Sequence, residues 1–416
     1  MLIVAAVIYR IMSICVERIQ LRIERRYGQG FKGQQYELGV QMTYDIAIVG
    51  AGIFGLSTAY ELARRGHSVL AIDRFGSGHP ATSSTGASRS IRIAYDHPFY
   101  VDLALEAIES WRRLETDTGQ TILHLTGQVD FGPQSKLEDL ARTVRAAGAA
   151  IEEVDAAELR HRFPEIALSR DEIGLFQRQA GTVLAESGMA ALLQAAKRAG
   201  VTYLAPERLL RLEPGASVKL YTERQQLGAK QVVVAAGPWA KDLLGSVGLH
   251  LPLAPAVAQV TFLDAPALID RPGIAEWRPN GETGVYGHPV PGIGYKIAFD
   301  SGASGWHPDV EEWEPDLAEE QRILDWLAQR MPSVAPKVSR TQRHPWTMTP
   351  DVDFIIDRWG QFIVAGGCSG HAFKFGPALG RLVADIVEGG EAPSVTRLER
   401  PALRQSAPSP TAPITR

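Results

Sequence analysis

Short apolar runs alternate with amphipathic stretches along most of the chain. The first run, 45–49, is followed by the turn Gly50-Ala51-Gly52-Ile53-Phe54-Gly55, an Ala/Leu-rich stretch to residue 65, and a second apolar run at 68–72. A short apolar run next to glycine predicts a buried strand, and the longer stretch predicts a helix. The fold is therefore expected to begin as strand, helix, strand.

The same patterns recur further along the chain. We expect helices at 101–115, 186–198, 317–329 and 376–387, and strands at 201–204, 218–222, 231–239 and 362–367. The β-branched run 231–239 is typical of a strand buried on both faces. Residues 76–90 are polar and small and predict a loop, whereas 251–300 alternates apolar stretches with Pro and Gly and predicts antiparallel strands.

The two ends differ from the rest. Residues 1–41 open with an apolar segment followed by several arginines, and its uninterrupted part, Leu2–Tyr9, is far shorter than the roughly 20 residues that span a bilayer. We expect 1–41 to be an upstream extension outside the fold, which would make Met42 the true start. An amphipathic surface helix is the alternative. The Pro/Ser-rich tail, 404–416, is expected to be disordered.

Composition narrows the function classes. With 416 residues, 45% hydrophobic and 22% charged, the chain has room for two packed domains. A formal net charge of −4 offers no broad basic surface for nucleic acid. The two cysteines, Cys15 and Cys368, form neither a disulfide framework nor a metal-ligand pattern, so we expect a reducing, cytoplasmic compartment and no metal site.

The first turn carries the clearest chemistry. Gly50 permits a tight turn, Gly52 lets backbone amides approach a pyrophosphate, and Gly55 lets the helix pack closely on the strand. Asp73 follows the second strand, 18 residues after Gly55, where an acid can hold ribose hydroxyls. The spacing predicts a dinucleotide site, although an ordinary glycine-rich turn is the simpler alternative.

Several separated motifs resemble one family. They are Ser88-Arg89-Ser90-Ile91-Arg92, Ala235-Ala236-Gly237-Pro238-Trp239, Gly294-Tyr295-Lys296-Ile297, Thr347-Met348-Thr349-Pro350-Asp351 and Gly367-Cys368-Ser369-Gly370-His371-Ala372-Phe373-Lys374-Phe375. Together they resemble the flavin-dependent amine oxidases of the D-amino-acid oxidase superfamily, in the sarcosine oxidase and N-methyltryptophan oxidase branch. The resemblance runs from about Thr43 to Leu403. It implies FAD rather than NAD as the cofactor.

The resemblance implies a fold and a cofactor site. The fold is α/β, with a Rossmann-like FAD-binding domain at 42–122, 180–250 and 343–403, and a discontinuous substrate domain at 123–179 and 251–342 built on a mostly antiparallel sheet. The implied FAD contacts are Gly50, Gly52, Ile53, Phe54, Gly55, Asp73, Arg74, Ser88, Ala236, Gly237, Trp239, Gly367, Gly370 and Lys374.

Four cations match the family's chemistry. Arg92 and Lys374 match the pair that binds the substrate carboxylate, and a guanidinium with an ammonium suits that task. Lys296 matches the oxygen-activating lysine, whose charge stabilises superoxide. Arg89 matches an arginine close to the flavin. The simpler alternative is solvated surface cations, but Arg92, Lys296 and Lys374 each lie between apolar neighbours.

The chain departs from the family at five positions, two of which, Ser84 and Thr85, replace tandem histidines before the arginine motif. His344 replaces the cysteine that usually tethers FAD, so we expect non-covalent FAD, with an 8α-histidyl link as the alternative. Trp346 replaces a tyrosine that shapes the substrate pocket, which removes a hydroxyl and adds bulk. Asp300 replaces a histidine, and it either pairs with Lys296 or receives a cationic group of the substrate. Sarcosine itself therefore does not follow as the substrate.

The sequence thus predicts an enzyme that oxidises the C–N bond of an amino acid or an N-alkyl amino acid. Hydride passes to FAD, and O₂ then accepts the electrons and becomes hydrogen peroxide. One alternative is a dehydrogenase with another electron acceptor, and a second is a flavoprotein with altered catalysis. The expected partners are a small carboxylate-bearing substrate and O₂, with no nucleic acid and no integral membrane span.

Overall fold

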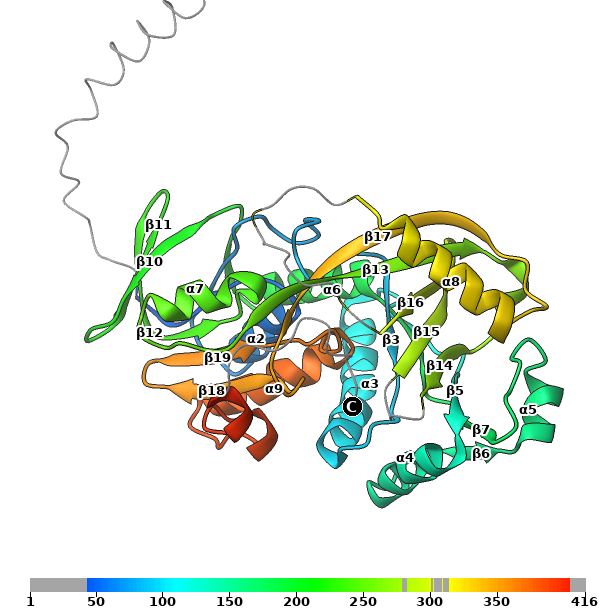
Figure 1. Ribbon diagram of the computed structural model, residues 1–416. Helices are drawn as coiled ribbons and strands as arrows, with labels where there is room; N and C mark the ends of the chain where they lie inside the picture. Colours follow the sequence, from blue (N-terminus) through cyan, green and yellow to red (C-terminus); the bar gives the residue numbers. More distant parts are fainter. Residues whose placement is uncertain (1–42, 279–282, 301, 303–308, 310–313, 405–416) are drawn as a thin grey trace, which may run out of the picture. The chain divides into compact units, whose positions relative to one another are not determined.

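The computed structural model describes residues 43–278, 283–300, 302, 309 and 314–404. All of them belong to one compact unit that starts at Thr43. The predictions for 1–41 and for 405–416 lie outside the described residues. Two large sheets dominate the arrangement of elements (Figure 1).

The first sheet is built around β1 (Thr43–Val49), an apolar strand with four buried residues at its carboxyl end. It pairs in parallel with β2 (Val69–Ile72) and β12 (Gln226–Val234). The parallel part continues into β9 (Thr202–Leu204) and β19 (Phe362–Gly366). Antiparallel strands complete the sheet: β10 (Leu209–Glu213), β11 (Val218–Thr222) and β18 (Ile355–Trp359).

Four helices build the main core against this sheet: α2 (Ile53–Arg64), α3 (Pro98–Thr118), α6 (Ala185–Arg198) and α9 (Gly376–Val387). Helix α3 starts where the His97 ring accepts a hydrogen bond from Phe99 N and ends at Gly119 in the left-handed conformation. Helices α2 and α9 cross closely at Gly380, where a Cβ would lie only 2.4 Å from Ser57 O. Glycine is thus required at this crossing.

The second sheet is antiparallel except where β14 and β5 pair. Its order is β17 (Lys337–Met348), β13 (Ala254–Asp264), β16 (Gly294–Phe299), β15 (Thr283–Val290), β14 (Gly273–Trp277), β5 (Gln128–Pro133), β7 (Glu172–Gln177) and β6 (Glu152–Val154). Helix α8 (Leu317–Arg330) packs on β13 and β16 (Figure 1).

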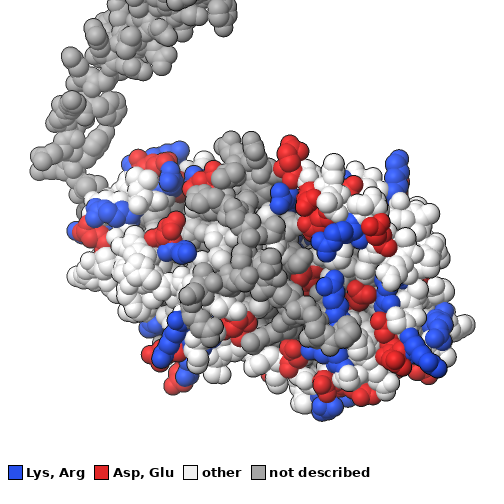
Figure 2. Space-filling model, in the orientation of Figure 1, with Lys and Arg blue, Asp and Glu red and all other residues white. Residues whose placement is uncertain are grey.

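The remaining elements are smaller. A three-stranded sheet joins β3 (Ser88–Ile91), β8 (Gly181–Leu184) and β4 (Leu123–His124). The short helices are α4 (Gln134–Ala146), α5 (Ala156–Arg162) and α7 (Ala240–Gly245), together with 3₁₀ turns at Gly237–Trp239, Pro266–Leu268, Phe373–Phe375, Ser394–Thr396 and Pro401–Arg404. Acidic and basic side chains intermingle over the described part of the face in Figure 2.

The predicted fold class is confirmed: the fold is mixed α/β, with a parallel-centred sheet and a mostly antiparallel one. Two details of the sequence reading were wrong. The strand expected at 231–239 ends at Val234, because Gly237 has a positive φ of 52° and starts a 3₁₀ turn. The loop expected at 76–90 ends before Ser88, where β3 begins. The division into two domains stays a prediction, and β17 crosses its boundary at residue 343 as one strand.

Candidate active site

The glycine turn after β1 leaves no room for side chains at two positions. Gly50 has φ 98°, and a Cβ there would lie 2.3 Å from Ala235 O on the neighbouring strand connection. A Cβ on Gly55 would lie 1.8 Å from Gly50 O. Both approaches are to backbone atoms, which cannot rotate away. The turn therefore brings α2 directly onto the end of β1.

The backbone amide groups in the first turn of α2 point out of the start of the helix. Gly52 is the N-cap and supplies no side-chain cap, and the first turn holds no acidic residue. Ser84 Oγ accepts from Ile53 N at 2.9 Å, while Asp73 Oδ2 accepts from Ala51 N at 2.7 Å. Such a helix start is favourable for an anion such as a pyrophosphate.

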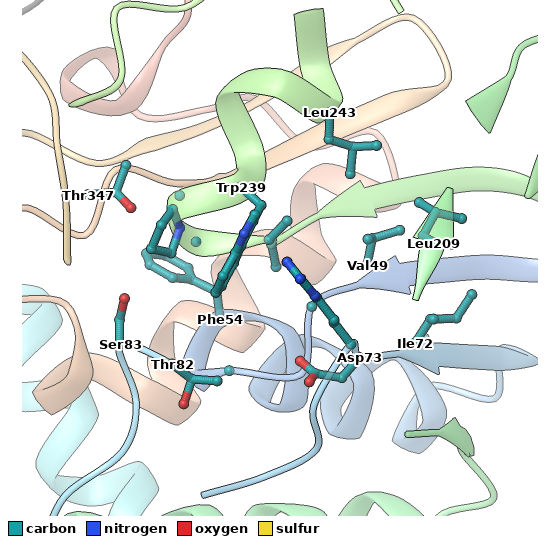
Figure 3. A pocket seen from close by; sticks show the side chains of 18 of the residues that line it. Val49, Phe54, Ile72, Asp73, Thr82, Ser83, Leu209, Trp239, Leu243 and Thr347 are labelled. Carbon is teal, nitrogen blue, oxygen red and sulfur yellow. The ribbon is translucent and has the colours of Figure 1, made fainter. Parts of the chain in front are cut away.

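A cavity of about 310 Å³ opens at this turn (Figure 3). It lies at the carboxyl ends of the parallel strands, the usual ligand position in such sheets. Arg74 and Trp239 form part of its wall, with Arg74 Cζ 5.6 Å from the indole centroid. Ten of the residues predicted for FAD line it: Gly50, Gly52, Ile53, Phe54, Asp73, Arg74, Ala236, Gly237, Trp239 and Gly367.

Gly366 supplies a direct test of whether a cofactor fits. It lines the cavity, and a Cβ built on it would meet nothing within 4 Å. Neither its φ nor a packing contact requires glycine, so the fold alone does not explain the missing side chain. A ligand lying against the backbone does explain it. The start of α2 also favours an anion such as a pyrophosphate. Taken together, the residues present fit FAD.

A second, smaller cavity of about 60 Å³ gathers the predicted cations. Its lining includes Arg89, Arg92, Lys296, Gly370 and Lys374. They come from β3 and the residues after it, from β16, and from the turn before α9, which are far apart in the sequence. A pocket that brings several buried cations together is suited to an anionic ligand.

Arg92 is 8% exposed, and its buried Nη1 has no hydrogen-bond partner. The guanidinium lies between two rings, with Cζ 4.9 Å from the Tyr95 centroid and 5.4 Å from the Trp277 centroid. Burial alone would lower the pKa of Arg92, but Tyr95, Asp130 and Asp300 together outweigh it and raise the pKa. Arg92 is therefore a charged group with a donor to spare.

Lys374 lines the same cavity at 7% exposure. Its Nζ donates to His371 O at 3.1 Å and lies 5.7 Å from the Tyr95 ring centroid. Burial lowers the pKa of Lys374, and the nearby charge of Arg92 lowers it further. An anion bound between the two cations would offset both effects and stabilise the ammonium form.

Lys296 is 2% exposed on β16, and its Nζ donates to Ser88 O at 2.9 Å. His288 is its partner across the strand pair and is also fully buried. His288 Nε2 lies 3.1 Å from Ser88 Oγ. Burial holds the pKa of both groups well below the usual values, and Arg89 and Lys296 add to the effect on His288. His288 is therefore neutral at pH 7.

Arg89 ties the loop before β3 together. Its guanidinium donates to Ser83 O at 3.0 Å, Thr85 O at 2.7 Å and Ser88 O at 2.7 Å, and it lies over the Phe373 ring. Burial lowers the pKa of Arg89. Because its partners are neutral carbonyls, its charge still acts on the second cavity.

The positions that depart from the family have different surroundings. Asp300 lines the second cavity, where its charge acts on Arg92, Lys374 and Tyr286. His344, on β17, and Trp346 are not among the described residues that line either cavity. The His344 imidazole lies against Gly86, and the Trp346 indole packs near Gly302. Ser88 and Gly55 also lie behind the cavity walls rather than in them.

Several lining residues have no motif in the sequence. Glu207 and Leu209 contribute to the first cavity and follow β9, so the rule that ligands bind at carboxyl ends of parallel strands was the available indication. Ser84 was identified only as a departure from the family, yet it supports the start of α2. Nothing in the sequence pointed to His288.

Two features are absent from the part of the chain that the structure describes. No helix there combines the length and apolar character needed to cross a bilayer. No cluster of three or more His, Cys, Asp or Glu side chains there is arranged to hold a metal ion.

Comparisons with known proteins identify the family. The family model for FAD-dependent oxidoreductases matches residues 45–386. Monomeric sarcosine oxidase from Streptomyces avermitilis is 32% identical over 389 residues, 88% of this chain and 99% of the relative. N-methyl-L-tryptophan oxidase from Citrobacter koseri is 29% identical over 363 residues, 84% of this chain and 95% of the relative. The chain belongs to the FAD-dependent oxidoreductase family.

Solved structures agree with this assignment. NikD, described as an unusual amino acid oxidase essential for nikkomycin biosynthesis, is similar with a TM-score of 0.72 and 26% identity, over 89% of this chain and 99% of NikD. The chain is thus an enzyme of a flavin family, homologous to sarcosine oxidases and amino acid oxidases.

Proposed function

We propose that this enzyme oxidises the C–N bond of an amino acid or an N-alkyl amino acid, with FAD as the hydride acceptor and O₂ as the final electron acceptor. FAD would lie in the first cavity and extend toward the second, where it supplies the hydride-accepting ring. The product would be an imine, which water hydrolyses. Hydrogen peroxide would be the second product.

The arrangement of Arg92 and Lys374 carries this proposal. Two cations share a cavity of about 60 Å³, and the buried Arg92 Nη1 lacks a partner. Leaving a guanidinium N–H unpaired costs free energy unless a ligand pairs with it. A substrate carboxylate would accept from Arg92 and pair with Lys374, which fixes the carbon beside the amine in one place.

Lys296 would assist the step with oxygen. A cation held beside the reacting ring stabilises the negative charge that develops on O₂. Lys296 Nζ is held on Ser88 O, and burial keeps its pKa well below the usual value with no acidic residue among the charges that act most strongly on it. A small anion that develops beside Lys296 would favour the ammonium form, and that charge would in turn stabilise the anion.

We infer that FAD is held without a covalent bond. The His344 ring lies against Gly86 and outside the described lining of both cavities. Cys368 lines the first cavity, but burial raises the pKa of its thiol, which disfavours the thiolate. The glycine turn, Asp73 and the start of α2 would then supply the affinity.

Asp300 bears on the choice of substrate. Its carboxylate acts on the cations that would receive the substrate, so it lies near the substrate's own charged groups. A substrate amine, or a second cationic group, would be stabilised beside it. The cavity's volume favours a compact substrate.

The test is anaerobic mixing of the purified flavoprotein with a panel of amino acids and N-methyl amino acids. Loss of the oxidised flavin absorbance, followed by hydrogen peroxide on admission of air, is the expected result. A panel that leaves the flavin oxidised would contradict the proposal for the substrate. Reduction without peroxide in air would assign a different electron acceptor.

A further inference from the structure

Asp130 is a buried carboxylate without a role in the chemistry described so far. It lies on β5 with no exposed surface, behind the second cavity. Its oxygens accept from three neutral side chains: Trp277 Nε1 at 3.1 Å, Gln128 Nε2 at 3.2 Å, and Gln177 Nε2. Burying a carboxylate costs free energy, and in the described structure these three hydrogen bonds to Asp130 offset that cost directly.

The bond to Gln177 leads to the backbone beside Arg92. Because the Gln177 amide donates to Asp130, its Oε1 must point the other way. There it accepts from Ile93 N at 2.7 Å and from Ala94 N at 3.0 Å. Asp130 thus sets the orientation of an amide that holds the two residues following Arg92.

The other two hydrogen bonds of Asp130 lead to the backbone segment before Arg92 and to the Arg92 side chain itself. Gln128 donates to Asp130 and accepts from Ser90 Oγ at 3.0 Å, two residues before Arg92. Trp277 donates to Asp130 through its indole N–H, and its ring lies 5.4 Å from Arg92 Cζ. Three paths therefore lead from the Asp130 carboxylate to Arg92. One reaches the chain before Arg92, one reaches the chain after it, and one reaches the ring that its guanidinium lies against.

We propose that Asp130 is the positioning residue for Arg92: through Gln128, Gln177 and Trp277 it holds the guanidinium aimed into the second cavity. The inference rests on the proposed function in one respect, that the ligand of Arg92 is the substrate carboxylate. Arg92 Nη1 is buried without a partner, so a less constrained guanidinium would turn to the nearest acceptor. Asp130 keeps it in place before the substrate arrives, which lowers the reorganisation that binding requires.

The charge of Asp130 supports this arrangement. Burial raises the pKa of Asp130, and the positive charge of Arg92 opposes that rise. In return, Asp130 contributes to the raised pKa of Arg92. A neutral hydrogen-bonding group in its place would lose this pairing and would also present an N–H to donors.

The experiment compares Asp130→Asn with wild type as holoenzymes. Acetate, a carboxylate without an amine, is titrated while the flavin absorbance reports binding, and KM and kcat are measured with a substrate from the panel. Asparagine preserves the shape but presents an amide to the N–H groups of Trp277 and the two glutamines. We expect the Kd of acetate and the KM of substrate to rise about tenfold, with kcat at saturation within about threefold of wild type.

Glu172→Gln is the matched control. Glu172 lies on the neighbouring strand β7, is 15% exposed at its side chain, and pairs with Arg330 at 2.8 Å. The Glu172→Gln substitution removes a carboxylate from the same sheet but leaves the three paths from Asp130 to Arg92 intact. The Kd of acetate should therefore stay at the wild-type value. Equal weakening in both variants, or no weakening in Asp130→Asn, would overturn the positioning role.

Two further variants keep the test decisive. If Asp130→Asn does not fold, Gln177→Met breaks the path in its middle and should raise the Kd of acetate in the same way; an unchanged Kd then overturns the proposal. Arg92→Met separates the two claims. If it leaves acetate binding unchanged, the substrate-binding role of Arg92 fails, whereas loss of binding there with normal binding in Asp130→Asn refutes only the role of Asp130.

Discussion

His288 and Lys296 are paired across the antiparallel strands β15 and β16, and both bond to the same residue, Ser88. One contacts its hydroxyl and the other its carbonyl. Both are buried with lowered pKa values, so two basic groups are held in a site where charge is costly. This pair places a neutral imidazole beside the lysine that we propose for oxygen activation.

The lowered pKa of His288 predicts acid sensitivity. The folded protein keeps this imidazole neutral, whereas the unfolded chain takes up a proton below pH about 6.5. Stability from this group is therefore present above pH 6.5 and is lost as the pH falls, by up to about 1.4 kcal/mol per pH unit. His288→Gln lacks the penalty and can still bond to Ser88, so its unfolding free energy relative to wild type should increase from pH 7 to pH 5.

Urea unfolding of both proteins across that range checks this expectation. Other carboxylates and histidines titrate in both proteins and cancel in the difference. A difference that stays constant with pH would mean that His288 is not held neutral.

Lys296→Met should separate reduction of the enzyme from its reoxidation. Removing the cation should slow reoxidation of the reduced enzyme by O₂ by about 10²–10³-fold. Reduction by substrate should change much less, because Lys296 is not part of the carboxylate site. Stopped-flow mixing of the reduced protein with oxygenated buffer measures the rate. Lys230→Met, which removes a lysine with 69% side-chain exposure, is the control, and equal rates in all three proteins would refute the role of Lys296.

Gly366→Val tests the cofactor cavity without disturbing the fold. The added side chain meets open space, and valine suits a strand, so the apoprotein should unfold at a temperature close to that of wild type. The side chain would occupy the cavity, and FAD affinity should fall at least about tenfold. Gly55→Ala is the contrasting variant: its Cβ would lie 1.8 Å from Gly50 O, so it should lose stability as well. Normal FAD affinity in Gly366→Val would place the cofactor elsewhere.

Acid precipitation of the purified protein tests the absence of a covalent tether. With His344 outside the cavity lining, FAD should pass into the supernatant and leave a colourless pellet. A yellow pellet in wild type that becomes colourless in His344→Ala would establish an 8α-histidyl link instead.

The sequence predicted the strand–helix–strand unit from local rules, whereas it predicted the roles of the four cations through the family resemblance. A Cβ on Gly50 or Gly55 would lie less than 2.5 Å from a backbone oxygen, so glycine is required at both positions and the requirement is visible as a motif. Lys296 and Lys374 lie between apolar residues, which indicates burial of a charged group.

Asp130 and His288 could not be found in this way. The run Val129-Asp130-Phe131 alternates, and alternation predicts an acid facing solvent. Instead, Trp277 and Gln177 come from other strands and cover it. His288 likewise depends on its register with Lys296 and on Ser88, which is 200 residues away in the sequence. Partners assembled from distant segments leave no local pattern.

The central claim is that Arg92 and Lys374 select a carboxylate beside the amine that is oxidised. The most direct measurement is anaerobic flavin reduction by an amino acid from the panel and by the amine that lacks only its carboxylate. The amine should reduce the flavin on the order of 100-fold more slowly in wild type, and Arg92→Met should lose most of this discrimination. Equal rates for the two compounds in wild type would contradict the account.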